Sequence, residues 1–166
     1  MNSYDRIVGR LSSIPLFESI KDNTTALQEL ARICHTETAG KGKTIIAEGE
    51  LGSTLYIVDT GGVEIHKRTR AGDDYTVVQL QAENNVFFGE LALIDDDKRS
   101  ATVIATEDSE FIVIEKSRFL SLGDTHPAIA LPITRAISRI VAGRLRKTTS
   151  DMLTIFDALV EEISAG

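Results

Sequence analysis

The feature that most constrains the fold is a long central region of short apolar runs. From about Thr36 to Ile114, apolar side chains recur with a period of two, which is typical of β-strands that present two distinct faces. The clearest runs are Leu55-Tyr56-Ile57-Val58, Val63-Glu64-Ile65-His66 and Val103-Ile104-Ala105. Turn signals such as Gly61-Gly62 separate them. We therefore predict a mainly β protein with flanking helices, built on an antiparallel β-roll, a jelly-roll-like barrel, over residues 36–115.

The stretch from Phe88 to Thr102 lies within this region and has the groups that a small phosphate ester needs. Gly89 lets the backbone approach a ligand, and residues 90–93 favour one helical turn whose first N–H groups attract an anion. Arg99 can donate paired, charge-assisted hydrogen bonds to two phosphate oxygens. Glu90 is repelled by phosphate and is better suited to accept from a sugar hydroxyl. The stretch is interpreted as a cradle for a sugar and a phosphate.

The same stretch resembles the phosphate-binding cassette of the cyclic-nucleotide-binding domain, found in catabolite activator proteins, nucleotide-gated channels and cAMP- and cGMP-dependent kinases. That cassette is written Phe-Gly-Glu-Leu-Ala-Leu, a variable loop, then Pro-Arg-Ala/Ser/Thr-Ala-Thr. The chain matches it at residues 88–93 and 99–102, with Lys98 in place of the usual proline and the acidic run 95–97 in the loop. The resemblance extends from about Ile14 to Thr149. It implies ligand contacts at Phe88, Gly89, Glu90, Leu91, Ala92, Arg99, Ser100, Ala101 and Thr102.

Helices are expected on both sides of the roll. Residues 1–35 are predicted to form an N-terminal helical segment that breaks at Pro15, with Thr25 and Gln28 at capping-box spacing and Cys34 beside His35 on the helix. Residues 116–166 are predicted to form C-terminal helices that act as a hinge and a dimer helix. One helix covers residues 116–122, and Pro127 begins another, in which Pro132 either bends the helix or marks its true start.

An apolar seam along the last helix predicts a helical partner. Its members recur in steps of four and three, the spacing of a two-helix seam. They are Val141, Leu145, Thr148, Met152, Ile155 and Leu159. The simplest partner is a second copy of the chain, which makes a homodimer; the other interpretation is an amphipathic helix that packs back onto the roll.

Thr148 is the polar member of that seam, and its hydroxyl needs a partner. The run from Arg144 to Ser150 is similar to the end of the dimer helix in catabolite activator proteins, where a Thr and the following Ser, one from each subunit, contact the adenine. The resemblance implies base contacts at Thr148 and Thr149. In the family, Ala after the cassette arginine goes with cAMP and Thr with cGMP; Ser100 lies between, and Thr148 favours cAMP over cGMP.

Charge and cysteine content exclude several classes of function. The 18 basic and 25 acidic residues give a net charge of −7, which argues against direct nucleic-acid binding. One cysteine, Cys34, excludes an internal disulfide and fits a reducing cytoplasm. No run is long and apolar enough to span a membrane. The acidic run 95–97 lacks the spacing of a calcium loop, and His35, His66 and His126 are scattered, so no metal site is expected.

These features predict a non-enzymatic cyclic-nucleotide sensor whose ligand rearranges the C-terminal helices. If the chain is complete, its output is an unknown effector protein or a change in self-association. The alternative is a ligand-independent interaction or dimerisation module with a vestigial cassette, in which Arg99 pairs with residues 95–97 on the surface and Glu90 only complements a helix end. A cupin-like enzyme needs clustered ligands inside the barrel, where the strands offer only His66.

Overall fold

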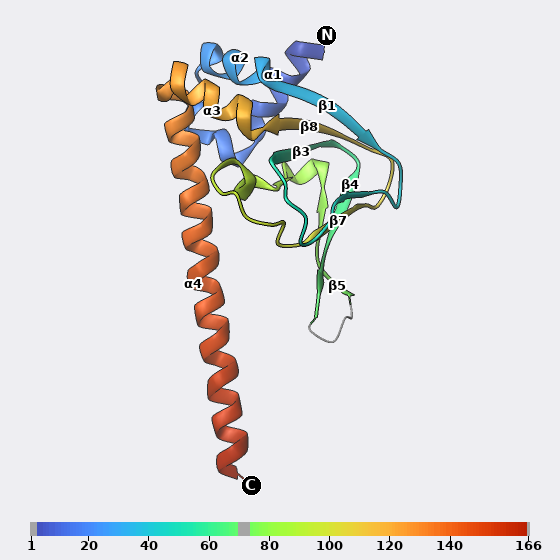
Figure 1. Cartoon of the computed structure of the whole chain (residues 1–166), viewed down its shortest axis with the longest axis vertical. Helices are drawn as coiled ribbons and strands as arrows, with labels where there is room; N and C mark the ends of the chain where they lie inside the picture. Colours follow the sequence, from blue (N-terminus) through green and yellow to red (C-terminus); the bar gives the residue numbers. More distant parts are fainter. Residues whose placement is uncertain (1–2, 70–73, 166) are drawn as a thin grey trace.

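The chain folds into a β-roll that is capped by helices and flanked by one very long helix. A computed structural model describes residues 3–69 and 74–165, and Figure 1 shows the arrangement; residues 1–2 and 166, at the ends of the two expected helical segments, lie outside the described part. The strands are β1 (Cys34–Ala39), β2 (Thr44–Ile46), β3 (Thr54–Thr60), β4 (Gly62–Arg68), β5 (Asp74–Gln81), β6 (Phe87–Phe88), β7 (Thr102–Ala105) and β8 (Ser109–Glu115).

The strands form two antiparallel sheets, which confirms the predicted roll. The first sheet has the order β1-β8-β3-β6 and the second the order β2-β7-β4-β5. Their inner faces enclose an aromatic and aliphatic core in which Tyr56 stacks on Phe88, with ring centroids 5.2 Å apart, and Phe111 meets both rings edge-on.

Both faces of strands β3 and β8 are buried, and each face contributes to a different apolar core. On β3, Tyr56 and Val58 point into the roll, whereas Leu55 and Ile57 pack against the helices outside it. Strand β8 repeats the arrangement with residues 111–114. The predicted alternation is therefore correct, but here it separates two apolar cores rather than a core from solvent.

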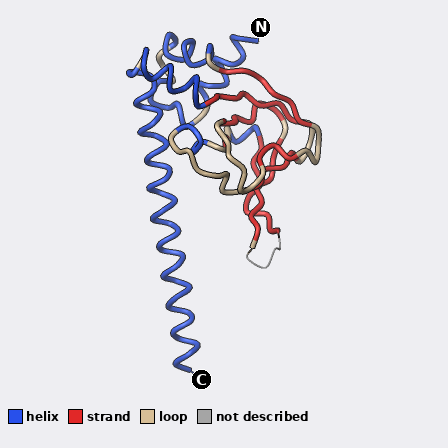
Figure 2. Tube along the Cα trace, in the orientation of Figure 1, coloured by secondary structure: helices blue, strands red, loops and turns tan. Residues whose placement is uncertain are grey.

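The N-terminal helices cover the outer face of the first sheet (Figure 2). They are α1 (Ser3–Ser13), η1 (Pro15–Ile20), which begins at the predicted proline break, and α2 (Thr24–Arg32). The capping-box prediction was wrong: the side chain of Asn23 accepts from the Ala26 N–H at 3.0 Å and caps α2, so Thr25 lies inside the helix. Cys34 and His35 lie on β1 instead of a helix, so the strands carry a second histidine besides His66.

Two arginines fix α1 to the roll. Arg10 donates to the carbonyl oxygens of Val58 and Ala82, both at 2.6 Å, and to the side chain of Asn85 at 2.7 Å. Arg6 makes a two-pronged ion pair with Glu110, which lowers the pKa of that carboxyl. Both arginines lie beside Asp59, whose pKa is raised by burial.

The C-terminal part consists of α3 (Lys116–Thr125) and α4 (Pro127–Ala165), with η2 (Ala82–Asn84) and η3 (Glu90–Leu93) completing the elements. Helix α4 begins at Pro127 as predicted, passes through Pro132 and continues without a break for 39 residues. Its first turns pack against α3 and η1 in the helical core through Ile129, Ile133 and Ile137. Its C-terminal half extends past the roll (Figure 1).

Candidate functional site

The predicted cassette spans the end of β6, the short helix η3 and the start of β7. Gly89 has a φ of +76°, a left-handed conformation that side-chain-bearing residues rarely adopt. This turn directs Glu90 to Leu93 into η3, the single helical turn expected from the sequence. The cassette therefore folds as a tight turn, one helical turn and an exposed loop that leads to Arg99.

Arg99 points back across the cassette and is held by neutral oxygens. Its Nη2 donates to the carbonyl oxygen of Thr54 at 2.9 Å and to the hydroxyl of Thr54 at 2.8 Å. No carboxylate among the described residues forms an ion pair with it, so the expected alternative of a surface pair with residues 95–97 is absent from residues 3–69 and 74–165. Burial lowers the pKa of the Arg99 guanidinium. This is a half-buried cation whose charge is not neutralised by an ion pair.

Two glycines make room for this arginine. A Cβ added to Gly52 would lie 1.9 Å from Arg99 Nε, and one added to Gly89 would lie 2.8 Å from both Arg99 Nη1 and the Thr54 carbonyl oxygen. Separations below 3.0 Å are essentially never observed for a Cβ. The guanidinium thus lies close against the backbone of two glycines, where no side chain would fit.

Glu90 is almost fully buried and has a partner from a distant part of the chain. Its side chain is 3% exposed, and its Oε1 accepts a hydrogen bond from Nη1 of Arg144 on α4. The side chain of Arg144 is 60% exposed, so the pair lies at the edge of the protein with only its acidic partner enclosed. It links the cassette directly to the long helix.

A cavity of about 670 Å³ lies between the cassette, strands β4 and β5, and α4. This volume lies within the range of about 300 to 1,000 Å³ that is usual for small-molecule sites. Nine of the eleven residues expected from the sequence line it. They are Phe88, Gly89, Glu90, Leu91, Ala92, Arg99, Ser100, Ala101 and Thr148.

Thr102 and Thr149, both described residues, lie outside this lining. The hydroxyl of Thr102 accepts from the Glu48 N–H at 3.0 Å, and that of Thr149 donates to the Leu145 carbonyl oxygen at 2.9 Å. Both hydroxyls thus have partners within the protein itself.

The cavity has a charged side and an apolar side. Cations line it at Lys67, Lys98, Arg99, Arg144 and Lys147, and anions at Glu90, Asp95 and Asp97. Five basic and three acidic residues make the lining positive, although the whole chain carries −7. Strands β4 and β5 supply the apolar lining residues Ile65, Val77, Val78 and Leu80.

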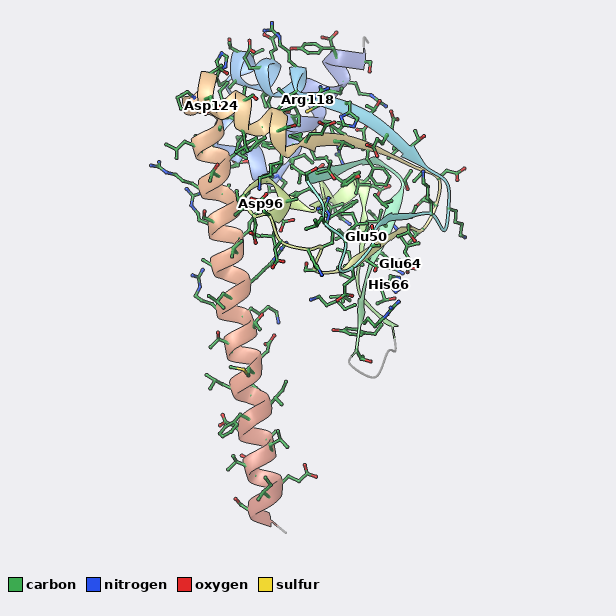
Figure 3. All side chains as sticks on the ribbon, viewed as in Figure 1. Glu50, Glu64, His66, Asp96, Arg118 and Asp124 are labelled. Atoms are coloured by element: carbon green, nitrogen blue, oxygen red, sulfur yellow. The ribbon has the colours of Figure 1, made fainter. Side chains whose placement is uncertain are left out.

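The acidic loop is oriented toward solvent. Asp95, Asp96 and Asp97 are all exposed, and Figure 3 labels Asp96. Asp96 makes an ion pair at 2.6 Å with Lys116, at the start of α3. Lys116 also donates to the Asp95 carbonyl oxygen at 2.9 Å. The loop is therefore tied to α3, and one of its three charges is compensated there.

Thr54 and Arg144 are among the residues of the site that sequence reasoning missed. Thr54 accepts from Arg99 through both its backbone carbonyl and its hydroxyl, across 45 residues of sequence, a separation for which no local pattern gives a signal. Arg144 could have been found, because it precedes Thr148 by four residues and so lies on the same face of α4.

Among residues 3–69 and 74–165, no group of three or more His, Cys, Asp or Glu side chains is arranged to hold a metal ion. Within the same residues, no helix is both long and apolar enough to cross a membrane.

Comparisons with known proteins agree with this geometry. A protein-family model, the Cyclic nucleotide-binding domain, matches residues 36–126, more than half of the chain. The Cyclic AMP receptor protein of Thermus thermophilus is 30% identical over 112 residues, which make up 68% of this chain. Human cGMP-dependent protein kinase 2 is 34% identical over 110 residues, or 66% of this chain. The crystal structure of the Thermus thermophilus Catabolite Activator Protein superimposes with a TM-score of 0.70 at 27% identity, covering 83% of this chain and 61% of that one.

The matched relatives are longer than this chain. The match covers 49% of the Thermus protein and 14% of the human kinase, so the chain spans about half the length of the first and a small part of the second.

Proposed function

The chain belongs to the cyclic nucleotide-binding domain family, and on that basis we propose that it is a non-enzymatic cyclic-nucleotide sensor that binds cAMP in preference to cGMP. The ligand occupies the cavity beneath α4, and its binding changes how α4 packs on the roll. The observation that carries the proposal is Arg99, a half-buried cation without an ion-pair partner among the described residues, in the wall of a positive cavity.

The phosphate is assigned to Arg99. Thr54 occupies one side of the guanidinium and leaves further N–H groups for a ligand. A phosphate monoanion there gains charge-assisted hydrogen bonds from Arg99 and offsets part of the net positive charge of the lining. Ser100 and Ala101 follow in the same wall of the cavity.

The sugar is assigned to Glu90. A buried carboxylate can accept from a sugar hydroxyl, and here it already accepts from Arg144. A ligand that shares or takes over this acceptor changes the contact between the cassette and α4. The coupling free energy is the difference between the bound and free arrangements of that contact.

The base is assigned to the apolar wall of β4 and β5, with Thr148 at its edge. The hydroxyl of Thr148 supports adenine, as does the name of the Thermus relative, Cyclic AMP receptor protein. The human relative is a cGMP-dependent kinase, and for this reason cGMP is the second ligand to test. We also propose Thr149 as a contact to the base, one that it can make only if α4 moves.

We further propose that the protein is a cytoplasmic homodimer joined through α4 that signals to an effector protein. The exposed seam of α4, including Leu145, Met152 and Leu159, supports the dimer because a monomer leaves it in water. A vestigial cassette is the second candidate, favoured by one observation: Glu90 makes an ion pair with Arg144, a residue of the same chain.

Calorimetric titration of the full chain with cAMP, cGMP and linear AMP tests the proposal. We expect micromolar or tighter binding of cAMP, weaker binding of cGMP and much weaker binding of AMP, whose phosphate is not part of a ring. Binding of cGMP more tightly than cAMP would reverse the choice of base. No heat with either cyclic nucleotide would leave the vestigial module as the function.

A further inference from the structure

The distal segment of α4, residues 149–164, is exposed on every side. Each of its side chains is exposed, and Figures 1 and 2 show this part of the helix clear of the roll. An extended exposed apolar surface marks a site of interaction. The large apolar side chains of the distal segment are Met152, Leu153, Ile155, Phe156, Leu159, Val160 and Ile163.

These side chains form two rows on different sides of the helix. Three of them, Met152, Ile155 and Leu159, belong to the seam defined above. At 100° per residue, the centre of the other row lies roughly 80° from the centre of the seam. A homodimer joined through the seam therefore leaves this second row exposed at the side of the helix pair. The second row consists of Leu153, Phe156, Val160 and Ile163.

The second row is flanked by carboxylates. Asp157 follows Leu153 by four residues and precedes Val160 by three, so it lies beside both. Glu161, four residues after Asp157, continues this line along the helix. Both carboxylates are exposed, and neither forms an ion pair within the described part of the chain. The distal segment as a whole has four acidic residues and no basic one.

A second copy of the chain does not fit the second row. The distal segment of another α4 is itself acidic, so pairing the two rows sets carboxylates beside carboxylates. The first half of another α4 is basic, but it is already packed on its own helical core. Its exposed side chains between residues 131 and 141 are all polar, so they give an apolar row nothing to pack against. They are Arg135, Ser138 and Arg139.

We propose that the second row docks an amphipathic helix of the effector protein, one whose apolar face is flanked by Lys or Arg. The proposal rests on the effector proposed above and specifies its chemistry. The four anchors recur in steps of three and four, the spacing with which one helix presents an apolar face to another. They span about 15 Å along the axis, so a partner helix of about three turns covers them.

The flanking charges select a basic partner over an acidic one. Asp157 and Glu161 are like charges four residues apart, an arrangement that destabilises a helix. A Lys or Arg of the partner placed beside them offsets this repulsion, whereas a carboxylate there increases it. The apolar anchors thus supply the contact area, and the two carboxylates supply the preference for a partner with basic flanks.

Fluorescence anisotropy with the full chain tests the proposal. The probes are two labelled synthetic helices that share one leucine face and differ in their flanks, which are lysine in the first and glutamate in the second. The lysine probe should bind at micromolar concentration, at least tenfold more tightly than the glutamate probe, and its binding should weaken as salt rises. Equal binding of both probes, or binding of neither, would overturn the proposal.

Two pairs of substitutions locate the docking surface. Leu153→Ser with Val160→Ser should weaken binding of the lysine probe at least tenfold. The matched control is Thr154→Ala with Ala158→Ser, two exposed positions on the opposite side of the helix, and it should bind as the wild type does. All four positions are exposed, so the variants should fold. Unchanged affinity after the first pair of substitutions would overturn the proposal.

Charge reversal tests the selection of the partner. Asp157→Lys with Glu161→Lys should transfer the preference to the glutamate probe. Asp22→Lys with Glu83→Lys changes the net charge by the same amount at exposed positions outside α4, and it should keep the preference for the lysine probe. Reversal in both proteins would show that net charge alone selects the probe, which would overturn the proposal.

Sedimentation distinguishes the effector from a second copy. The Leu153→Ser, Val160→Ser chain should form the same assembly as the wild type, because both positions lie away from the seam. A smaller assembly would show that a second copy covers the second row, and would overturn the proposal.

Calorimetry with cAMP separates this inference from the proposed function. Every substituted position lies outside the cavity lining, so nucleotide binding should persist in all of these variants. Binding of the lysine probe without nucleotide binding would leave the docking surface standing and remove the sensor. Nucleotide binding with no binding of either probe would do the reverse.

Discussion

Arg144, on the long helix α4, donates a hydrogen bond to the buried carboxylate of Glu90, 54 residues earlier in the cassette. It is an ion pair between the cassette and α4 at the level of the cavity. The cassette contributes to both cores, because Phe88 lies in the core of the roll and Leu93 lies in the helical core on which the first turns of α4 pack. Under the proposed function, a ligand at Glu90 acts on this contact between the cassette and α4.

Replacing Arg144 by Gln should destabilise the protein by about 1 to 2 kcal/mol. Glu90 then keeps its burial and loses its cationic partner, but the exposed position of Arg144 reduces the cost below that of a fully buried pair. Urea unfolding measures the change. Arg146→Gln, an exposed arginine two residues later, is the matched control and should shift stability by less than about 0.5 kcal/mol. Equal effects of the two variants would show that the ion pair contributes nothing.

Gly89→Ala should lose stability and nucleotide affinity together. A side chain at φ +76° costs about 1 to 2 kcal/mol, and the added Cβ meets both Arg99 Nη1 and the Thr54 carbonyl oxygen at 2.8 Å. Gly9→Ala provides a control of opposite sign, because Gly9 is inside α1 and its added Cβ meets nothing within 4 Å. That variant should gain up to about 1 kcal/mol. Thermal unfolding of both variants measures the two changes in stability. A Gly89→Ala variant as stable as the wild type would contradict the turn geometry.

Arg10→Ala should destabilise the chain by about 3 kcal/mol, because it leaves the carbonyl oxygens of Val58 and Ala82 without this donor and removes a cation beside buried Asp59. Chemical denaturation gives the value. The control is Arg32→Ala, because Arg32 makes a surface i,i+3 ion pair with Glu29 and no other ion pair within the described part of the chain. Its cost should stay below about 0.5 kcal/mol. A loss as small as the control's would mean that α1 is fixed by apolar packing alone.

Cys34 should react very slowly with alkylating reagents in the folded protein. Burial raises the pKa of its thiol to about 12, against an ordinary value of about 8.5, so at pH 8 the reactive thiolate is on the order of a thousandfold scarcer than in an unfolded chain. The rate of iodoacetamide labelling at pH 8, with and without denaturant, provides the test. Similar rates in the two conditions would show that the thiol is accessible and ionised.

The parts of the fold predicted correctly are those encoded by local patterns. Period-two alternation and glycine turns located the strands, Pro15 and Pro127 marked η1 and α4, and Gly89 with Glu90 predicted the helical turn of the cassette. Each signal acts within a few residues, which is why the sequence alone was sufficient to predict these elements.

The predictions that failed or were missing depend on distant contacts. A helix over Cys34 and His35 was expected from apolar spacing, but pairing with Ile114 and Val113 of β8 draws both residues into a strand. The capping box predicted at Thr25 does not form, because Asn23, another residue of that turn that can cap a helix, caps α2 instead. The ion pair of Glu90 with Arg144 and the bonds from Arg99 to Thr54 join residues 54 and 45 positions apart, beyond any local pattern.

The most direct test of the central claim, that Arg99 holds the phosphate of a cyclic nucleotide, is calorimetric titration of cAMP into wild type, Arg99→Ala and the control Arg146→Gln. Removing one partner of a desolvated charge pair costs about 2 to 5 kcal/mol, so Arg99→Ala should bind at least tens of times more weakly. Wild type and Arg146→Gln should bind alike. Unchanged affinity in Arg99→Ala would contradict the assignment of the phosphate to this cassette.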